Sequence, residues 1–458
     1  MKQSFYGGVH PNDRKELARH KEVAPLSAAP KQVVIAMAMH VGAPCKPIVA
    51  VGDQVKVGQK IGEIAGLGAP IHASVSGVVK AVEPRPYVGG GKVMSVVIEN
   101  DFQDTWGSVL TPHPDYSKLS CEEIVEIVKE AGITGMGGAG FPTHVKITSG
   151  IGKVNTVIIN GAECEPYITG DHRTMLERPE EIIGGAKFLA KMFGVDKVVI
   201  GVEDNKRNGI DAMNKVIAEQ KAPVVVEPLR CRYPQGGEKQ LCQAITGRQV
   251  PPGGLPADIG CAVFNINTTC AIYRALTTGM PVVRKIVTVS GSGVVEPKNL
   301  ECPIGTPVSS LLDACGGLKD GTYKLIAGGP MMGMAQYTAD ISVAKGTGAI
   351  LAFCENEEKT VENPQCIRCG KCVSVCPMHL EPLFMYQYAS KGMVEELNDA
   401  HIMDCMECGA CSYICPARMH LTHMFKTGKQ LVKDKAAADR AAAEAKKKAE
   451  EAKEAAAK

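Results

Sequence analysis

The chain has 458 residues, a length that corresponds to about three domains of ordinary size. Apolar residues make up 45% and charged residues 22% of it, a composition typical of soluble globular proteins. The formal net charge of +2 argues against a nucleic-acid-binding protein, because such proteins carry a strong basic field. No apolar run approaches the roughly 18–20 residues that cross a bilayer, so we expect no direct transmembrane span.

Cysteine usage is the unusual feature of the composition. The chain contains 18 cysteines, and eight of them lie between Cys366 and Cys415. Residues 1–20 contain no apolar stretch of the kind found in secretory signals, so we expect a reducing compartment. Clustered thiols then indicate metal binding rather than disulfides. The ten other cysteines are expected to be mostly reduced core residues.

An N-terminal segment, residues 1–30, precedes a region of short β-branched runs. Residues 31–110 alternate these runs with turns that contain Gly, Pro and Asp, which predicts an all-β domain. The region resembles the barrel-sandwich fold of biotinyl and lipoyl carrier domains. The hairpin that holds the modified lysine in those domains corresponds here to residues 66–69, which contain no lysine. We therefore expect a structural module.

The middle of the chain predicts a layered α/β domain over residues 120–280. A helical pattern begins near Glu122 with Ser120 as its N-cap, and buried strands are expected at 154–160 and 198–202. Residues 283–335 return to short strands around one helix and resemble the soluble-ligand-binding β-grasp module. The last segment, 433–458, is rich in Ala, Lys and Glu without an apolar stripe, which predicts an exposed helix or a disordered tail.

Residues 358–430 contain two copies of the bacterial ferredoxin pattern C-x2-C-x2-C-x3-C-P. In two-cluster ferredoxins the fourth cysteine of each copy ligates the other cluster. Structural zinc fits poorly, because its ligands usually form two separated pairs. We expect an α-helical domain with two [4Fe–4S] clusters. Cluster 1 is predicted to use Cys366, Cys369, Cys372 and Cys415, and cluster 2 is predicted to use Cys405, Cys408, Cys411 and Cys376.

A glycine-rich loop at residues 132–143 includes G-x-G-x-x-G, at Gly135, Gly137 and Gly140. It follows a helix pattern rather than a strand, so it is not an ordinary Rossmann fingerprint, and no Gly-Lys-Ser/Thr follows it as in a P-loop. Such a backbone allows close approach of a flat or phosphorylated ligand, with Lys146 supplying positive charge. The alternative is that this glycine-rich loop is a turn needed only for packing.

Two acidic turns extend this candidate site. The strand at 154–160 ends in Asn160, and Glu163 and Glu165 follow it. A second turn runs from Tyr233 to Glu238. Ligands of open α/β sheets lie at the carboxyl ends of strands. This position favours a ligand-binding role for the acids of these turns over the alternative that they are solvated loop residues.

Taken together, these motifs resemble one family over nearly the whole chain, the C subunit of the Rnf-type electron transport complex. Residues 5–11 resemble its N-terminal signature, and the order of domains is the same. The middle domain is similar to the NADH-binding flavoprotein subunit of respiratory complex I. The resemblance implies an FMN- and NAD(H)-binding site made by Gly135, Gly137, Gly138, Gly140, Phe141, Lys146, Asn160, Glu163, Glu165, Tyr233, Gly236, Glu238, Asn265, Asn267 and Thr268.

The function implied by the resemblance is electron transfer between NAD(H), FMN and two [4Fe–4S] clusters. FMN performs the hydride transfer, so no side chain is assigned as catalytic. The chain would be a peripheral subunit on the cytoplasmic face of a bacterial or archaeal cell membrane. Its partners would be other subunits of the complex, including a ferredoxin-like electron acceptor, and indirectly ferredoxin, with no nucleic acid. The complex would link ferredoxin and NAD+ to Na+ or H+ transport.

Two other hypotheses remain open from the sequence. One is a soluble flavin/iron–sulfur reductase, such as a cobalamin (corrin) reductase with the same domain order. The other is a non-enzymatic iron–sulfur scaffold whose flavin domain no longer binds FMN. Co-purification with membrane subunits distinguishes the first from the Rnf-type hypothesis, and failure to bind FMN would favour the second.

Overall fold

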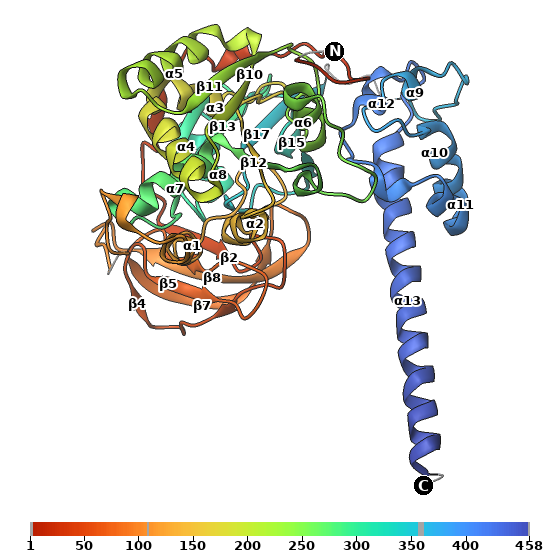
Figure 1. Ribbon diagram of the computed structural model, residues 1–458, viewed down its shortest axis with the longest axis horizontal. Helices are drawn as coiled ribbons and strands as arrows, with labels where there is room; N and C mark the ends of the chain where they lie inside the picture. The colour runs from red at the N-terminus through yellow and green to blue at the C-terminus, as the bar shows by residue number, and fades with distance from the viewer. Residues whose placement is uncertain (1–2, 108–109, 356–360, 457–458) are drawn as a thin grey trace. The chain divides into compact units, whose positions relative to one another are not determined.

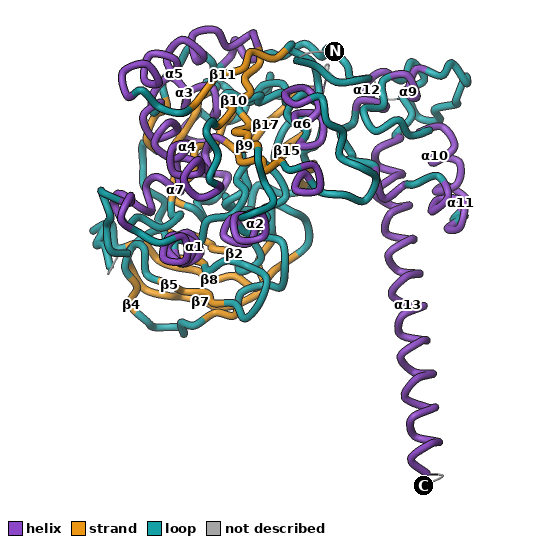
Figure 2. Tube along the Cα trace, in the orientation of Figure 1, coloured by secondary structure: helices purple, strands orange, loops and turns teal. Residues whose placement is uncertain are grey.

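The computed structural model describes residues 3–107, 110–355 and 361–456, which form two compact units (Figure 1). The large unit comprises Met1–Ser4, His10–Val250 and Gly254–Glu358. The cysteine-rich unit comprises Phe5–Val9, Pro251–Gly253 and Lys359–Lys458. Within the described residues every strand belongs to the large unit, and the cysteine-rich unit consists of helices and loops (Figure 2).

Two small antiparallel sheets form the first part of the large unit, as the turn-rich pattern predicts. Alternate side chains of strand β2 enter the core, and Val33 and Ile35 are fully buried. The first sheet has the order β2 (Gln32–Ala36), β8 (Lys92–Asn100), β7 (Gly77–Pro86), β4 (Gln54–Val55), and the second has the order β3 (Lys46–Pro47), β5 (Lys60–Glu63), β6 (Ile71–His72).

A four-stranded parallel sheet forms the centre of the large unit. Its strands are short runs of β-branched and apolar residues, which is typical of parallel strands buried on both faces. Both strands expected from the sequence are present in it. The order is β11 (Val224–Leu229), β10 (Val198–Glu203), β9 (Thr156–Asn160), β12 (Cys261–Asn265).

Helix α1 (Cys121–Glu130) begins at the predicted cap. The Ser120 hydroxyl accepts a hydrogen bond from the Glu123 amide, and the Glu123 carboxylate accepts one from the Ser120 amide. The other helices around the sheets are α2 (Thr143–Gly150), α3 (Gly170–Glu177), α4 (Pro179–Phe193), α5 (Arg207–Gln220), α6 (Glu238–Thr246) and α7 (Ile266–Thr278), with single 3₁₀ turns at Lys15–Leu17, Tyr116–Lys118, Asp204–Lys206 and Pro256–Ile259.

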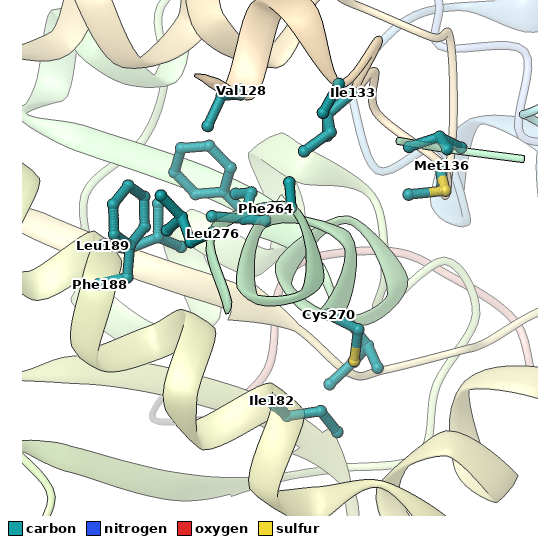
Figure 3. Close-up of a cluster of buried hydrophobic side chains, with 14 of the residues drawn as sticks. Val128, Ile133, Met136, Ile182, Phe188, Leu189, Phe264, Cys270 and Leu276 are labelled. Carbon is teal, nitrogen blue, oxygen red and sulfur yellow. The ribbon is translucent and has the colours of Figure 1, made fainter. Parts of the chain in front are cut away.

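The helices and the parallel sheet share one apolar core (Figure 3). Phe188 of α4 and Leu276 of α7 are fully buried in it. Val128 of α1 and Met136 of the glycine loop belong to the same cluster. The glycine loop is therefore anchored to the core on one side by an apolar side chain.

A six-stranded mixed sheet completes the large unit and includes strands from outside residues 283–335. Strand β1 pairs in parallel with β14, although the two strands are far apart in the sequence. Helix α8 (Val308–Ala314) forms where the pattern predicts a helix. The strand order is β1 (Val23–Pro25), β14 (Lys298–Pro303), β13 (Arg284–Ser290), β17 (Ala349–Cys354), β15 (Thr322–Ala327), β16 (Met334–Gln336).

The cysteine-rich unit packs short helices around a small apolar core. Its helices are α9 (Lys371–Ser374), α10 (Pro382–Lys391), α11 (Val394–Asp399), α12 (Ala410–Ile414) and α13 (Leu421–Ala456), with a 3₁₀ turn at Ile402–Asp404.

Helix α13 combines a core helix with the predicted tail. Leu421 and Phe425 are buried, whereas residues 433–448 are exposed. The predicted tail segment is therefore helical over its described part, in line with its Ala, Glu and Lys content. Among the described residues, no helix is both long enough and apolar enough to cross a membrane.

Candidate functional site

The eight clustered cysteines surround two cavities in the cysteine-rich unit. We call the first set cysteine group 1 and the second set cysteine group 2. The four thiols of group 1 line one cavity, and the four thiols of group 2 line a second. Group 1 is Cys366, Cys369, Cys372 and Cys415, and group 2 is Cys376, Cys405, Cys408 and Cys411.

Each group combines three cysteines of one motif copy with the fourth cysteine of the other. These are the same sets that the sequence predicts for the two clusters. Within the described residues, no three His, Cys, Asp or Glu side chains form a group that could hold a metal ion as they stand. The thiols are instead distributed over the walls of two cavities, and four thiolates around one cubane are the donor set of a [4Fe–4S] cluster. The residues present therefore fit two such clusters.

The two groups differ in burial. Cys366 and Cys369 of group 1 are exposed, whereas Cys376, Cys408 and Cys411 of group 2 are buried. Burial raises the pKa of Cys405 to about 11 and that of Cys408 to about 12. Deprotonation of these thiols requires a compensating positive charge, which bound iron would provide.

Two other parts of the chain close over group 2. The Gly8 amide donates a hydrogen bond to the Val375 carbonyl at 2.8 Å, directly before Cys376. The Lys429 ammonium donates to the Cys405 carbonyl at 2.5 Å and pairs with Glu407 at 2.7 Å. Tyr6 stacks on His379 with ring centroids 4.4 Å apart. Group 2 is thus covered by the N-terminal segment and by α13.

In the large unit, the glycine loop meets the N-terminus of α7. The Met136 amide donates to the Thr268 hydroxyl at 3.0 Å, and the Gly135 amide donates to the Phe141 carbonyl at 2.9 Å. A Cβ atom at Gly137 would lie 2.6 Å from the Asn265 amide nitrogen. Gly137 and Gly138 remain exposed, so their backbone is open to a ligand.

Asp171 is a residue of this site that sequence reasoning missed. Its carboxylate accepts hydrogen bonds from Asn265 at 2.9 Å and from Asn267 at 2.5 Å, so it orients both predicted amides. Lys285, also missed, donates to the Met136 carbonyl at 3.2 Å. Burial lowers the pKa of Lys285 to about 8, and the negative charge of Asp171 opposes that shift. An acid in the first turn of α3, close after the acidic turn, is the only sequence signal for Asp171.

The two predicted acids point toward backbone amides. Glu163 accepts from the Asp171 amide at 2.5 Å and from the His172 amide at 3.2 Å, and thereby caps α3. Glu165 accepts from the amides of Met331 and Met332 at 3.1 and 2.9 Å. Burial raises the pKa of each carboxyl to about 7. Glu163 therefore links the first acidic turn to α3, and Glu165 links it to the loop at Met331 and Met332.

Tyr233 joins the two acidic turns, because its hydroxyl donates to the Glu165 carboxylate at 3.3 Å. Asn160 also joins them, since its side-chain amide donates to the Gly236 carbonyl at 2.8 Å. The structure thus brings together two turns that the sequence presents as separate features.

Lys146 and Glu238 form an ion pair with an Nζ to Oε1 distance of 2.8 Å. Lys146 also donates to the Val263 carbonyl at 3.0 Å. Both side chains are partly exposed, at 30% and 42%. Their charges are therefore held in place and accessible at one edge of the site.

Gln235 leaves polar atoms that a ligand could satisfy. It is fully buried, and within the described residues neither its Oε1 nor its Nε2 has a hydrogen-bond partner. A buried amide without partners costs roughly 2–7 kcal/mol. The edge of a flavin ring offers donors and acceptors to such an amide. This orphaned amide and the open glycine backbone fit an FMN-type ligand.

The barrel-sandwich domain braces the glycine loop from the other side. The Val41 amide donates to the Gly140 carbonyl at 3.0 Å, and a Cβ at Gly140 would lie 3.3 Å from the His40 backbone. The buried Lys345 donates to the carbonyls of Pro70 and Gly132 at 2.9 and 2.6 Å. These contacts support the glycine loop, and the purely structural role expected of a hairpin without a carrier lysine stays a prediction.

A further lysine, Lys15, ties the N-terminal segment to the first acidic turn. It is buried and donates to the carbonyls of Glu163 at 2.8 Å, Glu165 at 3.1 Å and Ile168 at 2.5 Å. Sequence reasoning missed this lysine, because nothing in residues 1–30 indicates a partner so far along the chain.

Four family models match the chain in the predicted order. A barrel sandwich hybrid domain model of RnfC proteins matches residues 3–103, and a Nuo51 FMN-binding domain model matches 128–274. An SLBB domain model matches 286–335, and a 4Fe-4S dicluster domain model matches 358–416. The FMN-binding domain model covers the glycine loop, and the 4Fe-4S dicluster model covers all eight clustered cysteines.

The curated relatives include members of ion-translocating complexes. The chain is 45% identical to the C subunit of the Na(+)-translocating ferredoxin:NAD(+) oxidoreductase complex of Acetobacterium woodii, over 88% of this chain and 90% of the relative. It is 43% identical to the C subunit of the proton-translocating complex of Clostridium ljungdahlii, over 88% of each chain. The C subunit of an ion-translocating oxidoreductase complex of Vibrio cholerae is 38% identical over 87% of this chain and 52% of the relative.

Among solved structures, a chain of an NAD+-reducing [NiFe]-hydrogenase matches with a TM-score of 0.50 at 19% identity, covering 68% of this chain and 64% of that chain. This likeness concerns the fold. The relatives named above do not favour the soluble corrin reductase, since all three belong to ion-translocating complexes. With 45% identity over nearly the whole of one of them, the chain belongs to the family of Rnf-type C subunits of ion-translocating ferredoxin:NAD+ oxidoreductase complexes.

Proposed function

We propose that the chain is the NAD(H)-oxidising and NAD+-reducing subunit of a membrane-bound Rnf-type complex. It works as a peripheral subunit on the cytoplasmic face of the cell membrane, next to the other subunits and a ferredoxin-like electron acceptor. The observation that carries this proposal is that the eight clustered cysteines line two cavities, four thiols in each. In the same chain, the glycine loop lies within the residues that match an FMN-binding domain model.

The cofactors supply the electron chemistry. When bound, FMN exchanges hydride with NAD(H) and single electrons with [4Fe–4S] clusters. Cysteine group 1 would hold one cluster and cysteine group 2 the other. The predicted residues of the large unit, from Gly135 to Thr268, would hold FMN and NAD(H).

The protein residues position the ligands and control charge. The exposed backbone of Gly137 and Gly138 admits a flat ligand, and Lys146, held by Glu238, offers a positive charge at its edge. Asp171 fixes the amides of Asn265 and Asn267. Burial raises the pKa of Glu165 to about 7, and the amides of Met331 and Met332 hold its carboxylate in place.

We also assign the finer divisions of the chain. Residues 283–335, of which 286–335 match the SLBB model, are proposed to form a β-grasp module within the six-stranded sheet. The ranges 31–110, 120–280 and 358–430 are proposed as the barrel-sandwich, flavin and two-cluster domains. Limited proteolysis tests these boundaries, because cleavage should fall between the ranges.

An anaerobic titration tests the proposed function. The full chain, reconstituted with iron, sulfide and FMN, is expected to bind one FMN and two clusters. Addition of NADH should bleach flavin and cluster absorbance together. Zinc in place of iron, or no response to NADH, would contradict the proposal.

A pair of variants tests the flavin site. Gln235→Leu removes the orphaned buried amide, and we expect it to weaken FMN retention by about tenfold, the equivalent of about one lost hydrogen bond. Gln103→Leu changes an exposed glutamine and serves as the matched control. Equal FMN retention in both variants, measured by flavin fluorescence after gel filtration, would remove Gln235 from the site.

A further inference from the structure

We propose that Cys242 and Cys261 form a redox-active dithiol, which hydrogen peroxide converts to a disulfide between helix α6 and strand β12. Cys261 is the attacking thiolate, and Cys242 is the thiol that closes the disulfide. Neither belongs to the eight clustered cysteines or to the predicted flavin site. The proposal therefore gives a role to two of the ten cysteines that the proposed function leaves unused.

The two thiols lie in contact inside the large unit. Cys242 is on α6 and Cys261 is the first residue of β12, and both are buried in one small apolar cluster. The Cys242 thiol donates a hydrogen bond to the Cys261 sulfur. Two sulfurs in hydrogen-bond contact need to approach by only about 1–2 Å to reach the bond length of a disulfide.

A guanidinium faces the Cys261 sulfur. Nη2 of Arg248 lies 3.4 Å from the Sγ atom of Cys261. The same guanidinium donates to the Ile259 carbonyl at 2.6 Å and to the Thr156 hydroxyl at 2.7 Å, which fixes its position. Because these two partners are neutral, the positive charge of Arg248 is left to stabilise a thiolate at Cys261.

These contacts make Cys261 different from other buried cysteines. The hydrogen bond from Cys242 lowers the pKa of Cys261 to about 7, although burial opposes the shift, and the charge of Arg248 lowers it further. Burial raises the pKa of Cys302 to about 12 and that of Cys315 to about 11. The same hydrogen bond raises the pKa of Cys242, which therefore keeps its proton. A thiolate beside a protonated thiol is the pair that disulfide formation requires.

The reaction balances with hydrogen peroxide as the oxidant. The Cys261 thiolate attacks one peroxide oxygen, the O–O bond breaks, and a sulfenic acid and hydroxide form. The Cys242 sulfur then attacks the sulfenic sulfur, the S–O bond breaks, and the oxygen leaves as water. The sum is Cys261–SH + Cys242–SH + H2O2 → Cys261–S–S–Cys242 + 2 H2O, in which the two sulfurs give two electrons to the peroxide.

Burial selects a small oxidant. The side chains of Cys242 and Cys261 are 0% and 1% exposed. Hydrogen peroxide is little larger than water, whereas a peptide disulfide such as oxidised glutathione needs an open face on the sulfur that it meets. We therefore expect peroxide to oxidise the pair and oxidised glutathione to leave it reduced.

The disulfide would join the two elements that hold Lys146. Its ion-pair partner Glu238 begins α6 and lies about one helical turn before Cys242. Its other partner, the Val263 carbonyl, follows Cys261 closely on β12. Drawing α6 toward β12 moves Glu238 relative to Lys146. We expect oxidation to weaken NAD(H) binding, and this consequence rests on the proposed function, whereas disulfide formation does not.

Peptide mapping tests the dithiol. The full chain with its clusters and FMN is treated without air with a stoichiometric amount of hydrogen peroxide or of oxidised glutathione. It is then denatured in N-ethylmaleimide and digested with trypsin. The predicted cross-link joins peptide 240–248 to peptide 249–274. Because the second peptide also contains Cys270, a buried cysteine of α7, Cys270→Ala is the matched control and should keep the cross-link.

Three further variants separate the roles. Cys242→Ala should leave Cys261 as a sulfenic acid, which dimedone labels. Arg248→Gln should slow oxidation by about tenfold, because less of Cys261 is thiolate near pH 7, and Arg248→Lys should restore the rate. NADH should bind the oxidised wild type about fivefold or more weakly than the reduced form, the lower end of usual coupling between sites. In Cys242→Ala/Cys261→Ala, peroxide should leave the Kd for NADH unchanged.

Three results would overturn the proposal: a cross-link that disappears in Cys270→Ala, faster oxidation by oxidised glutathione than by peroxide, or a pair that stays reduced when peroxide already removes iron from the clusters. An equal Kd for NADH before and after cross-linking would contradict the effect on Lys146. Reduced wild-type protein that forms the cross-link but does not bind NADH would contradict the proposed function and leave the dithiol standing.

Discussion

The two cysteine groups arise from the same sequence pattern but occupy different environments. Two cysteines of group 1, Cys366 and Cys369, are exposed, whereas group 2 contacts the N-terminal segment, α13 and the Lys429–Glu407 pair. The motif itself specifies only the ligands and their crossing. Residues outside the motif decide which cluster meets solvent. Exposure of a cluster is therefore a property of the fold around the motif.

The largest expected effect comes from removing one ligand of each group. Cys408→Ala deletes a buried thiol of group 2, and we expect loss of that cluster together with the folding of the cysteine-rich unit, because metal binding and folding are coupled there. Cys369→Ala deletes an exposed thiol of group 1 and should leave the unit folded with one cluster. Iron analysis and far-ultraviolet circular dichroism distinguish the two. Equal loss of helix in both variants would contradict the expected difference between group 1 and group 2.

Iron chelation provides the second test. Because Cys366 and Cys369 are exposed and the group 2 thiols are mostly buried, a chelator should remove the group 1 cluster about tenfold faster or more. Electron paramagnetic resonance of reduced samples taken during chelation follows each cluster separately. Single-phase loss of all iron would show that enclosure does not protect group 2.

Removal of a partly buried cation should have a smaller effect. Lys429→Met leaves the Glu407 carboxylate and the Cys405 carbonyl without their partner, at an expected cost of about 1–3 kcal/mol in the unfolding free energy of the loaded unit. Lys371→Met, on the exposed rim of group 1, should cost less than about 0.5 kcal/mol. Denaturant titration monitored by cluster absorbance measures both. A larger loss in Lys371→Met would reverse the assignment of enclosed and open groups.

The smallest expected effect comes from two glycines in the left-handed region. Gly7 (φ 76°) and Gly370 (φ 74°) both have a positive φ, so alanine is strained at both positions. A Cβ at Gly7 would also lie 2.8 Å from the Val375 oxygen, whereas one at Gly370 meets no atom within 4 Å. We expect Gly7→Ala to cost about 1 kcal/mol more than Gly370→Ala. Hydrogen exchange of the Gly8 amide detects this difference, and equal protection in both variants would argue against a closed segment.

Much of the fold could be predicted, because its signals are local. The Ser120 cap, the buried strands β9 and β10 and helix α8 each depend on neighbouring residues. The family models and relatives confirm the resemblance to the Rnf-type C subunit. The individual FMN, NAD(H) and cluster ligands stay predictions.

What could not be predicted depends on contacts across the chain. Lys15 meets the Glu163 turn 148 residues later, and Asp171 meets Asn265 94 residues later. Single-sequence patterns contain no information on such pairs. For the same reason Glu163 and Glu165 were predicted only as ligand contacts, although their carboxylates accept hydrogen bonds from backbone amides of α3 and of the loop after β15.

The position of Phe5–Val9 in the cysteine-rich unit has a consequence for biogenesis. The segment is synthesised 367 residues before its partner at Val375. It therefore cannot close over group 2 until the cysteine-rich unit has been made. Docking of the N-terminal segment must wait for that unit.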